Sequence, residues 1–380
     1  MVQIGSLIGY IVFWPILILF ALTTSFWIYE IVFLARDWKK KEIEHGLDQI
    51  QVRILTIGSE GVVQNTVDSI PDELTERIVV AEKEMTISGA DVHVVPSDFS
   101  CNARYKARAV EWARRHVPCE KEYVLYLDED TIATGLEGIP DADIVQYSEH
   151  PVRTDSYLAY LCEIFRQGFQ IEQRAFSKLS IPLYAWGGGL AVRKELEDEI
   201  TWNFESMIED TRFTWIAIHY RDASFCLAKS HLYNQAPPSV GNMIRQRRRW
   251  ASGTREQLSL LPNRYRILFV ARNASWGASP LIPLLLLNSL FFQGITPTSF
   301  IYRFGSIVLS SFLAVWSLLG IYYYDANVKD SILLILLGPV LSSLHSVGAL
   351  WGFFSPVKQF NVTEKVDPSS EKISELASDD

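Results

Sequence analysis

Three acidic residues follow the clearest strand pattern in the chain. The apolar segment Tyr123–Leu127 runs directly into Asp128, Glu129 and Asp130. A continuous apolar run of this length is typical of a buried strand in a covered, mostly parallel sheet. Carboxylates at the C-terminal end of such a strand stand where open α/β sheets bind ligands. On an extended chain Asp128 and Asp130 would point the same way and could share one divalent cation that also binds phosphates. A solvated acidic turn is the alternative for so short a motif.

Other segments carry residues that suit the chemistry of phosphates and sugars. Residues 102–116 form a basic amphipathic pattern. At least one of its cations could reach a diphosphate, although a solvated helix face is the alternative for each: Arg104, Lys106, Arg108, Arg114 and Arg115. The turn Trp186–Gly189 would let backbone approach a ligand closely. Glu209 and Asp210 stand at a predicted helix start, where a carboxylate could act as a base or merely cap the helix. A basic run with a tryptophan, residues 244–253, is typical of an interfacial helix.

The order of strands and helices predicts the element that positions these residues. Three expected strands precede the Tyr123 strand, with helical patterns over 62–70 and 102–116 among them. Strands that alternate with helices in this way predict an α/β domain with a mostly parallel sheet. The expected strands are 51–57, 77–81 and 90–95, and a helix is expected over 62–70.

Composition excludes some classes of protein and favours a membrane location. Of the 380 residues 48% are hydrophobic, which is high for a soluble enzyme. The net charge of −9 argues against a general nucleic-acid binder, and no nucleic-acid partner is expected. The four cysteines show neither a Cys-x-x-Cys pair nor zinc spacing, so we expect them to be reduced.

Apolar segments at both ends of the chain predict membrane helices. Residues 4–34 are long enough to span a bilayer and too long for a signal peptide, although a hairpin of two short spans is an alternative. Arg36 and Lys39–Lys41 follow, so the positive-inside rule places the next segment in the cytoplasm. An interfacial helix is expected over 262–272, and further apolar segments lie at 277–295, 303–324 and 331–353.

Taken together, the motifs resemble those of glycosyltransferase family 2, the inverting nucleotide-sugar transferases with a GT-A fold. The matching order is the loop after the first strand, the basic helix, Asp-x-Asp, the glycine turn, Glu-Asp and Gln-x-x-Arg-Trp, over residues 50–255. The last motif is similar to that of the membrane-integrated branch, which includes cellulose and hyaluronan synthases. Within that branch the chain looks most like the egghead-type β-1,4-mannosyltransferases, on the segments 105–109, 127–131, 182–186 and 208–210.

The resemblance implies roles for individual residues. Asp210 would be the general base. The metal, Mg²⁺ or Mn²⁺, would be held by Asp128 and Asp130. The donor would be bound by Glu60, Glu82, Lys106, Asp128 and Arg249, and the acceptor by Trp186, Gly188, Gln246 and Trp250. One departure concerns the end of the second strand, where many relatives carry Asp and this chain reads Val80-Ala81-Glu82-Lys83-Glu84.

The C-terminal tail contains a further similarity. Phe360–Lys365 is similar to the Phe-x-Val-Thr-x-Lys gating element of cellulose synthases, which lies on the cytoplasmic side. Three full crossings after a cytoplasmic domain would put this tail outside. Either one apolar segment is interfacial or re-entrant, or the similarity misleads, and we expect a cytoplasmic tail.

These observations predict an integral membrane enzyme with its catalytic domain on the cytoplasmic side. The expected divisions are a transmembrane segment and basic flank (1–41), a GT-A domain (50–240), interfacial helices (241–272), transmembrane segments (273–355) and a polar tail (356–380). The expected partners are a nucleotide sugar (GDP-mannose or a UDP-sugar), a lipid-linked or glycolipid acceptor, and the membrane. The expected reaction is transfer of a sugar, mannose or glucose, to that acceptor. The alternatives are a processive polysaccharide synthase and a transporter or channel with a nucleotide-sensing domain.

Overall fold

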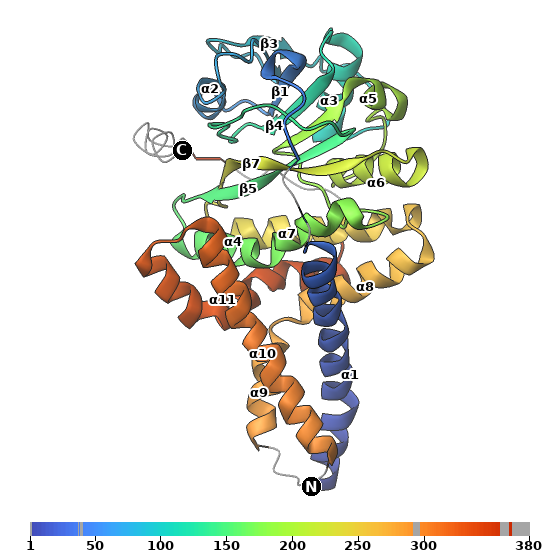
Figure 1. Ribbon diagram of the computed structural model, residues 1–380, viewed down its shortest axis with the longest axis vertical. Coiled ribbons are helices and arrows are strands. Elements are labelled where there is room, and N and C mark those ends of the chain that lie inside the picture. Colours follow the sequence, from blue (N-terminus) through green and yellow to red (C-terminus); the bar gives the residue numbers. More distant parts are fainter. Residues whose placement is uncertain (1, 37, 39–40, 292–296, 358–364, 367–380) are drawn as a thin grey trace. The chain divides into compact units, whose positions relative to one another are not determined.

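The computed structural model describes residues 2–36, 38, 41–291, 297–357 and 365–366 (Figure 1). They form two compact units. The sheet unit contains the described residues of Trp38–Asp155, Gln173–Pro238 and Glu364–Asp380, and the helical unit contains those of Met1–Asp37, Ser156–Glu172 and Ser239–Thr363. This differs from the expected division at one place, because Ser156–Glu172 falls inside the expected catalytic segment 50–240 but belongs to the helical unit.

A seven-stranded sheet of order β3-β2-β1-β4-β6-β5-β7 forms the centre of the sheet unit. Strand β6 runs antiparallel to β4 and β5, whereas the other described pairings are parallel. This confirms the predicted fold class. The strands are β1 (Ile50–Thr56), β2 (Glu76–Ala81), β3 (Asp91–Val94), β4 (Tyr123–Asp128), β5 (Ile144–Val152), β6 (Leu190–Arg193) and β7 (Phe225–Gln235).

The first four strands are those that the sequence predicts, and their parallel register sets where the site forms. Leu55 of β1 lies opposite Asp128 of β4, and Thr56 lies opposite Ala81 of β2. The C-terminal ends of three neighbouring strands therefore meet at one edge, the edge at which open α/β sheets bind ligands.

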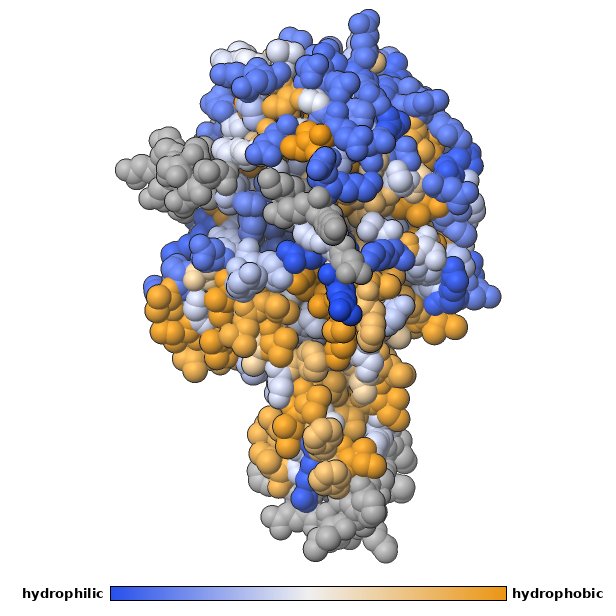
Figure 2. Space-filling view, in the orientation of Figure 1, coloured by the Kyte–Doolittle hydropathy of each residue, from blue (hydrophilic) through white to orange (hydrophobic). Residues whose placement is uncertain are grey.

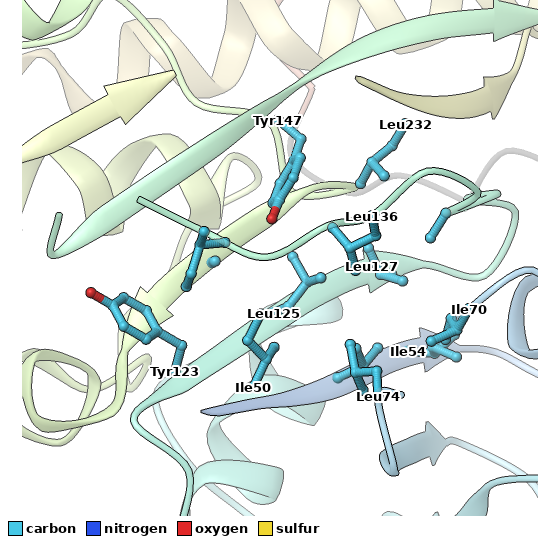
Figure 3. Close-up of a cluster of buried hydrophobic side chains, with 14 of the residues drawn as sticks. Ile50, Ile54, Ile70, Leu74, Tyr123, Leu125, Leu127, Leu136, Tyr147 and Leu232 are labelled. Carbon is cyan, nitrogen blue, oxygen red and sulfur yellow. The ribbon is translucent and has the colours of Figure 1, made fainter. Parts of the chain in front are cut away.

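Burial of apolar side chains on one face of the sheet holds these strands together. Figure 3 shows Ile50 of β1 with Leu125 and Leu127 of β4 on the side where Leu136 and Tyr147 lie. All five side chains are buried, at 3% exposure or less. Because successive residues of a strand point to opposite faces, Tyr126 lies on the other face, where its hydroxyl donates a hydrogen bond to the Glu197 carboxylate.

Helices connect the strands of the sheet unit. They are α2 (Glu60–Asp68), α3 (Lys106–His116), α5 (Lys194–Ile200) and α6 (Glu209–Arg221), with short helical turns at Leu47–Gln49 and Ile171–Lys178. Helix α3 begins later than the expected residue 102, because Tyr105 has a φ of 56° and therefore cannot continue a helix. That backbone conformation is unfavourable for a bulky side chain, and it stands directly before Lys106.

The helical unit contains the remaining long helices. They are α1 (Val2–Tyr29, extended by a π-turn at Glu30–Leu34), α4 (Tyr157–Gln170), α7 (Val240–Gln257, followed by a short turn at Leu258–Leu260), α8 (Asn263–Ala278), α9 (Leu281–Phe291), α10 (Pro297–Tyr324) and α11 (Val328–Phe354). Within the described residues, three stretches are long and apolar enough to cross a membrane: Phe13–Leu34, Phe300–Tyr324 and Val328–Phe354. Helix α1 continues through Pro15, so the alternative of an N-terminal hairpin is wrong.

The tail enters the sheet unit. Residues 360–364 of the predicted gating element lie outside the described residues, but Lys365 and Val366 are described. Gln235 at the end of β7 donates to the Val366 carbonyl at 2.6 Å and accepts from the Val366 N–H at 3.0 Å. This pair of hydrogen bonds places Lys365 beside the sheet.

Glycines allow two helix pairs of the helical unit to pack backbone against backbone. A Cβ at Gly320 of α10 would lie 2.5 Å from the carbonyl oxygen of Ile164 in α4, and one at Gly168 would lie 1.9 Å from the carbonyl of Trp316. A Cβ at Gly348 of α11 would lie 2.2 Å from the carbonyl of Ile244 in α7. A side chain at any of these positions would force the helices apart.

We therefore expect Gly320→Ala to lower stability by about 1–3 kcal/mol, the usual cost of overpacking. The matched control is Gly305→Ala on the same helix, where the new Cβ would lie an ordinary 3.4 Å from Leu17. Thermal unfolding of both variants in detergent measures the difference. Equal melting temperatures for the two variants would contradict the close packing of α4 and α10.

Candidate active site

Lys106 and Asp128 form the central contact of the candidate site. The Lys106 ammonium group lies 2.5 Å from Asp128 Oδ1 and donates to the Gly187 carbonyl at 3.1 Å. Burial favours the neutral amine, but the surrounding carboxylates, first of all Asp128, raise the pKa of Lys106 above its ordinary value. Lys106 is therefore a fixed cation at the end of β4.

The three acidic residues at the end of β4 do not form a continuous extended segment, because Glu129 and Asp130 lie in a turn. Asp128 is the last residue of the strand, and its carbonyl accepts a hydrogen bond from the Thr131 N–H at 3.1 Å. The expectation that Asp128 and Asp130 share a direction because the chain is extended is therefore wrong. The hydrogen bond that closes the turn makes this conformation favourable.

Asp130 is buried in this turn and has a cationic partner of its own. Its Oδ2 lies 2.6 Å from the Lys365 ammonium group and accepts from the Gln235 N–H at 3.2 Å. Its Oδ1 is buried without a hydrogen-bond partner among the described residues. An ammonium group thus lies on each of the two aspartates that the sequence predicts to bind a metal.

Asp128 and Asp130 could hold a divalent cation if phosphates or water completed its coordination. Within the described parts of the chain, no group of three or more His, Cys, Asp and Glu side chains is arranged so that it could hold a metal ion. Asp128 and Asp130 offer two carboxylates, and the orphaned Oδ1 of Asp130 is a vacant ligand atom. Mg²⁺ and Mn²⁺ often take few protein ligands and complete their coordination with phosphates and water, so this donor set suits them.

Asp210 lies in the first turn of α6, next to the same cation. Gly187 separates the two side chains: a Cβ there would lie 2.8 Å from Lys106 Nζ and 3.1 Å from Asp210 Oδ2. Burial and the neighbouring carboxylate of Glu209 raise the pKa of Asp210 to about 7, although Lys106 opposes the rise. A carboxylate with such a pKa can accept a proton near neutral pH and release it again.

Gln146 holds the glycine turn and was missed by the sequence analysis. Its side-chain amide donates to the carbonyls of Trp186 and Gly189 at 3.0 and 2.8 Å, and its oxygen accepts from the Trp186 N–H at 2.7 Å. The signal that could have identified it is a glutamine within the otherwise apolar run Ile144–Tyr147. Gly188, a predicted acceptor residue, is also fixed, because its carbonyl accepts from Thr131 Oγ1 at 3.1 Å.

Glu129 was also missed as a structural member of the site. Its buried carboxylate accepts from Thr56 Oγ1 at 2.6 Å, and its carbonyl accepts from Thr66 Oγ1 at 2.7 Å. Burial raises its pKa above the ordinary value. Glu129 therefore ties the acidic turn to the end of β1 and to α2.

The two glutamates predicted to bind the donor have other partners. Glu82, at the end of β2, accepts hydrogen bonds from Arg108 at 3.0 Å on both carboxylate oxygens. Glu60, the first residue of α2, accepts from the Thr86 N–H at 3.1 Å. Neither contact joins them to Lys106, so their role at the donor stays a prediction.

The remaining predicted residues, Gln246, Arg249 and Trp250, lie on α7 of the helical unit. Trp250 packs beneath Arg247, whose guanidinium carbon lies 4.1 Å from the ring centroid, and the corresponding distance for Arg166 is 5.7 Å. These contacts lie within the helical unit, and the donor and acceptor roles of the motif stay predictions.

Comparison with known proteins identifies the family. The model of glycosyl transferase family group 2 matches residues 123–337, which is more than half of the chain. A search of curated proteins finds no match.

Two solved structures are distantly similar. A mannosyltransferase from Pyrobaculum calidifontis, solved with GDP-mannose and Mn²⁺, is 15% identical with a TM-score of 0.48, over 88% of this chain and 99% of that one. A glucosyl-3-phosphoglycerate synthase from Mycobacterium tuberculosis, solved with Mn²⁺ and UDP-glucose, is 15% identical with a TM-score of 0.37, over 57% of this chain and 80% of that one. Likenesses this distant carry no inference about substrate. The family match spans the acidic turn, the glycine turn, Asp210 and α7, and the chain belongs to glycosyl transferase family group 2.

Proposed function

We propose that this nucleotide-sugar transferase is membrane-integrated, that it inverts the transferred sugar, and that its acceptor is lipid-linked or close to the membrane. The observation that carries the proposal is the grouping of Lys106, Asp128 and Asp210 around Gly187. A cation beside a carboxylate of raised pKa provides both functions that one displacement at a sugar carbon needs. One group stabilises the departing diphosphate, and the other accepts the proton of the attacking hydroxyl.

In this proposal Asp210 is the general base. The acceptor oxygen forms a bond to the anomeric carbon, the bond from that carbon to the diphosphate oxygen breaks, and the hydroxyl proton passes to Asp210. The pKa of about 7 makes Asp210 a stronger base than an exposed aspartate. A single displacement inverts the anomeric centre and needs no covalent intermediate.

Lys106 orients and stabilises the leaving diphosphate. An ammonium group has three donors, and Asp128 and the Gly187 carbonyl take two of them. The third is left for a phosphate oxygen, on which negative charge develops as the sugar departs. Asp128 and Asp130 would hold a Mg²⁺ or Mn²⁺ ion, which when bound supplies additional positive charge for the diphosphate.

The resemblance to egghead-type enzymes suggests GDP-mannose as donor and a lipid-linked sugar as acceptor. The candidate membrane spans support a membrane-bound acceptor, because they hold the enzyme where lipid-linked sugars are found. Arg249 would bind the diphosphate, and Gln246 and Trp250 the acceptor, as the Gln-x-x-Arg-Trp similarity implies. Membership of a transferase family favours transfer over the alternative of a transporter or channel.

The test is nucleotide release by the full-length protein in lipid nanodiscs. GDP-mannose, UDP-glucose and UDP-N-acetylglucosamine would be supplied with Mn²⁺ or Mg²⁺, with and without a glycolipid acceptor. We expect one donor to be consumed faster when acceptor is present, and product mass then distinguishes a single transfer from a processive synthase. Release from all donors at the rate of an Asp210→Asn protein would contradict the proposal.

Asp210→Asn should reduce turnover by about 10²–10⁴-fold, the usual contribution of a positioned base. Donor affinity should stay near that of the wild type, because the base contacts the acceptor. Single-turnover rates and donor binding measure the two effects separately. Glu209→Gln is the matched control, and a larger loss of turnover in that variant would mean that the adjacent carboxylate is the base.

The acid side of the pH profile should report Asp210. Only the carboxylate form accepts a proton, so kcat/KM for the acceptor should fall as pH decreases through a pKa at or below about 7. Glu209→Gln removes a neighbouring negative charge and lowers the pKa of Asp210, so activity should extend to lower pH. An acid limb that stays in place or moves to higher pH in this variant would contradict the assignment.

Lys365→Ala should strengthen binding of Mn²⁺ in the absence of nucleotide. The Lys365 ammonium group occupies Asp130 Oδ2 and therefore competes with any other cation for that carboxylate. Electron paramagnetic resonance of free Mn²⁺ measures the binding constant. Lys121→Ala, which removes an equal charge from a more exposed pair with Glu76, is the control and should have little effect. Unchanged or weaker binding in Lys365→Ala would contradict the competition.

A further inference from the structure

The two ends of α10 contact parts of the helical unit that are far apart along α1. This is expected of a helix that crosses a bilayer. Near its start, the ring of Tyr302 lies 5.7 Å from that of Trp14 in the first half of α1. At its end, the Tyr324 hydroxyl lies 2.9 Å from the Tyr160 hydroxyl of α4. Helix α10 therefore leads from the N-terminal half of α1 to α4.

The two ends of α11 lie beside α4 and α7, at the same height in the helical unit. In its first turn, Asp330 accepts a hydrogen bond from Tyr157, the first residue of α4. In its last turn, the Phe353 carbonyl accepts from Arg255 of α7 at 2.6 Å. Between them, Cys162 of α4 lies 3.8 Å from the Leu341 carbonyl. Figure 1 shows α11 next to α4 and α7 and running across the direction of α1.

The helices that contact the two ends of α11, α4 and α7, are not among the candidate membrane spans. Helices α4 and α7 are joined by a buried ion pair between Glu163 and Arg247, and the charge of Arg247 helps to hold the pKa of Glu163 below its ordinary value despite burial. Helix α7 carries arginines from Arg245 near its start to Arg255 near its end. A helix with cations along its whole length lies at the membrane surface and not across the hydrocarbon. Because α11 packs along it, α11 lies at the same depth.

The distribution of side chains on α11 does not fit a helix whose exposed face contacts water. The face that packs against other helices is mostly small or polar and contains two leucines, Leu334 and Leu341. Its small or polar buried members include Ser342, His345, Ser346, Gly348 and Gly352. After Lys329 in the first turn, the exposed residues of the helix are apolar. The large apolar residues of this outer face are Val328, Ile332, Ile335, Leu336, Val340, Val347, Leu350, Trp351 and Phe354, with exposures from 39% to 77%. In Figure 2 apolar colouring covers both the region of α11 and the long helices below it.

We propose that α11 lies along the membrane surface within one leaflet, with this outer face against lipid acyl chains, and does not cross the bilayer. The occupant is lipid because these side chains stay exposed within the helical unit and continue the apolar surface of α10. Only near the end of the face does one of them meet a charged group, where the Trp351 ring lies 3.9 Å from the guanidinium carbon of Arg248. Length and composition alone would make α11 a span. Its contacts at both ends place it parallel to the surface instead.

Depth measurement tests the proposal. Nitroxide labels would be attached to single cysteines at Ile332, Val347 and Phe354 of α11, in full-length protein in nanodiscs, after replacing Cys101 and Cys119 with Ser. Collisions with oxygen and with a nickel chelate give the depth of each label. We expect three similar depths, although Ile332 and Phe354 are about 33 Å apart along the helix. Depths that pass through the bilayer centre from Ile332 to Phe354 would overturn the proposal.

Labels on α10 are the matched control for the depth measurement, and thiol labelling of sealed vesicles is a second, independent test. Labels at Phe300, Ile307 and Leu318 of α10, which are also exposed, should differ in depth over about 27 Å. Independently, cysteines in place of Lys329 and Ser355, at the two ends of α11, should react with a membrane-impermeant thiol reagent from the same side of sealed vesicles. Reaction from opposite sides would establish a crossing and overturn the proposal without reference to catalytic activity.

Discussion

The ammonium group of Lys106 makes the candidate site possible. Asp128 and Asp210, both partly buried, approach this common cation. Its charge opposes the rise in the pKa of Asp210 that burial and the neighbouring carboxylate of Glu209 cause. Three local features of the backbone position the side chains around Lys106. The positive φ of Tyr105 starts α3 at Lys106, β4 ends at Asp128, and the missing side chain of Gly187 leaves room between the cation and the base.

Two buried polar residues, Gln146 in β5 and Glu129 in the acidic turn, fix the backbone around this cation. Gln146 satisfies three backbone groups of the glycine turn, and Glu129 connects the acidic turn to Thr56. Buried polar groups are costly unless hydrogen-bonded, and both of these side chains have their partners. The site is therefore held by hydrogen bonds that fix backbone, so that its charged side chains are positioned before substrate arrives.

The sequence predicts the strands whose apolar runs are unbroken and the residues that end them. The runs before Ala81 and Asp128 were identified because burial on both faces requires continuous hydrophobicity. Strand β1 was identified although Gln51 and Arg53 interrupt its apolar residues. Strand β5 was missed because its second half is polar and only partly buried. The acidic turn was expected to be extended, since nothing in Asp-Glu-Asp indicates the hydrogen bond that closes it. The contact of Lys365 with Asp130 joins residues far apart in the chain, so local patterns could place neither partner beside the other.

The inclusion of α4 in the helical unit has a consequence for how this enzyme can be divided. The chain leaves the sheet unit after Asp155 and returns at Gln173, so no single cut yields the sheet without α4. A fragment that ended at residue 238 would keep Glu163 and Gly168 but lose Arg247 and α10, the partners that cover them. Its α4 would present an apolar surface to water, and Glu163 would keep Arg166 as an ion-pair partner but lose Arg247. The catalytic sheet is therefore not a separable soluble module, and its solubility depends on helices that follow it in the chain.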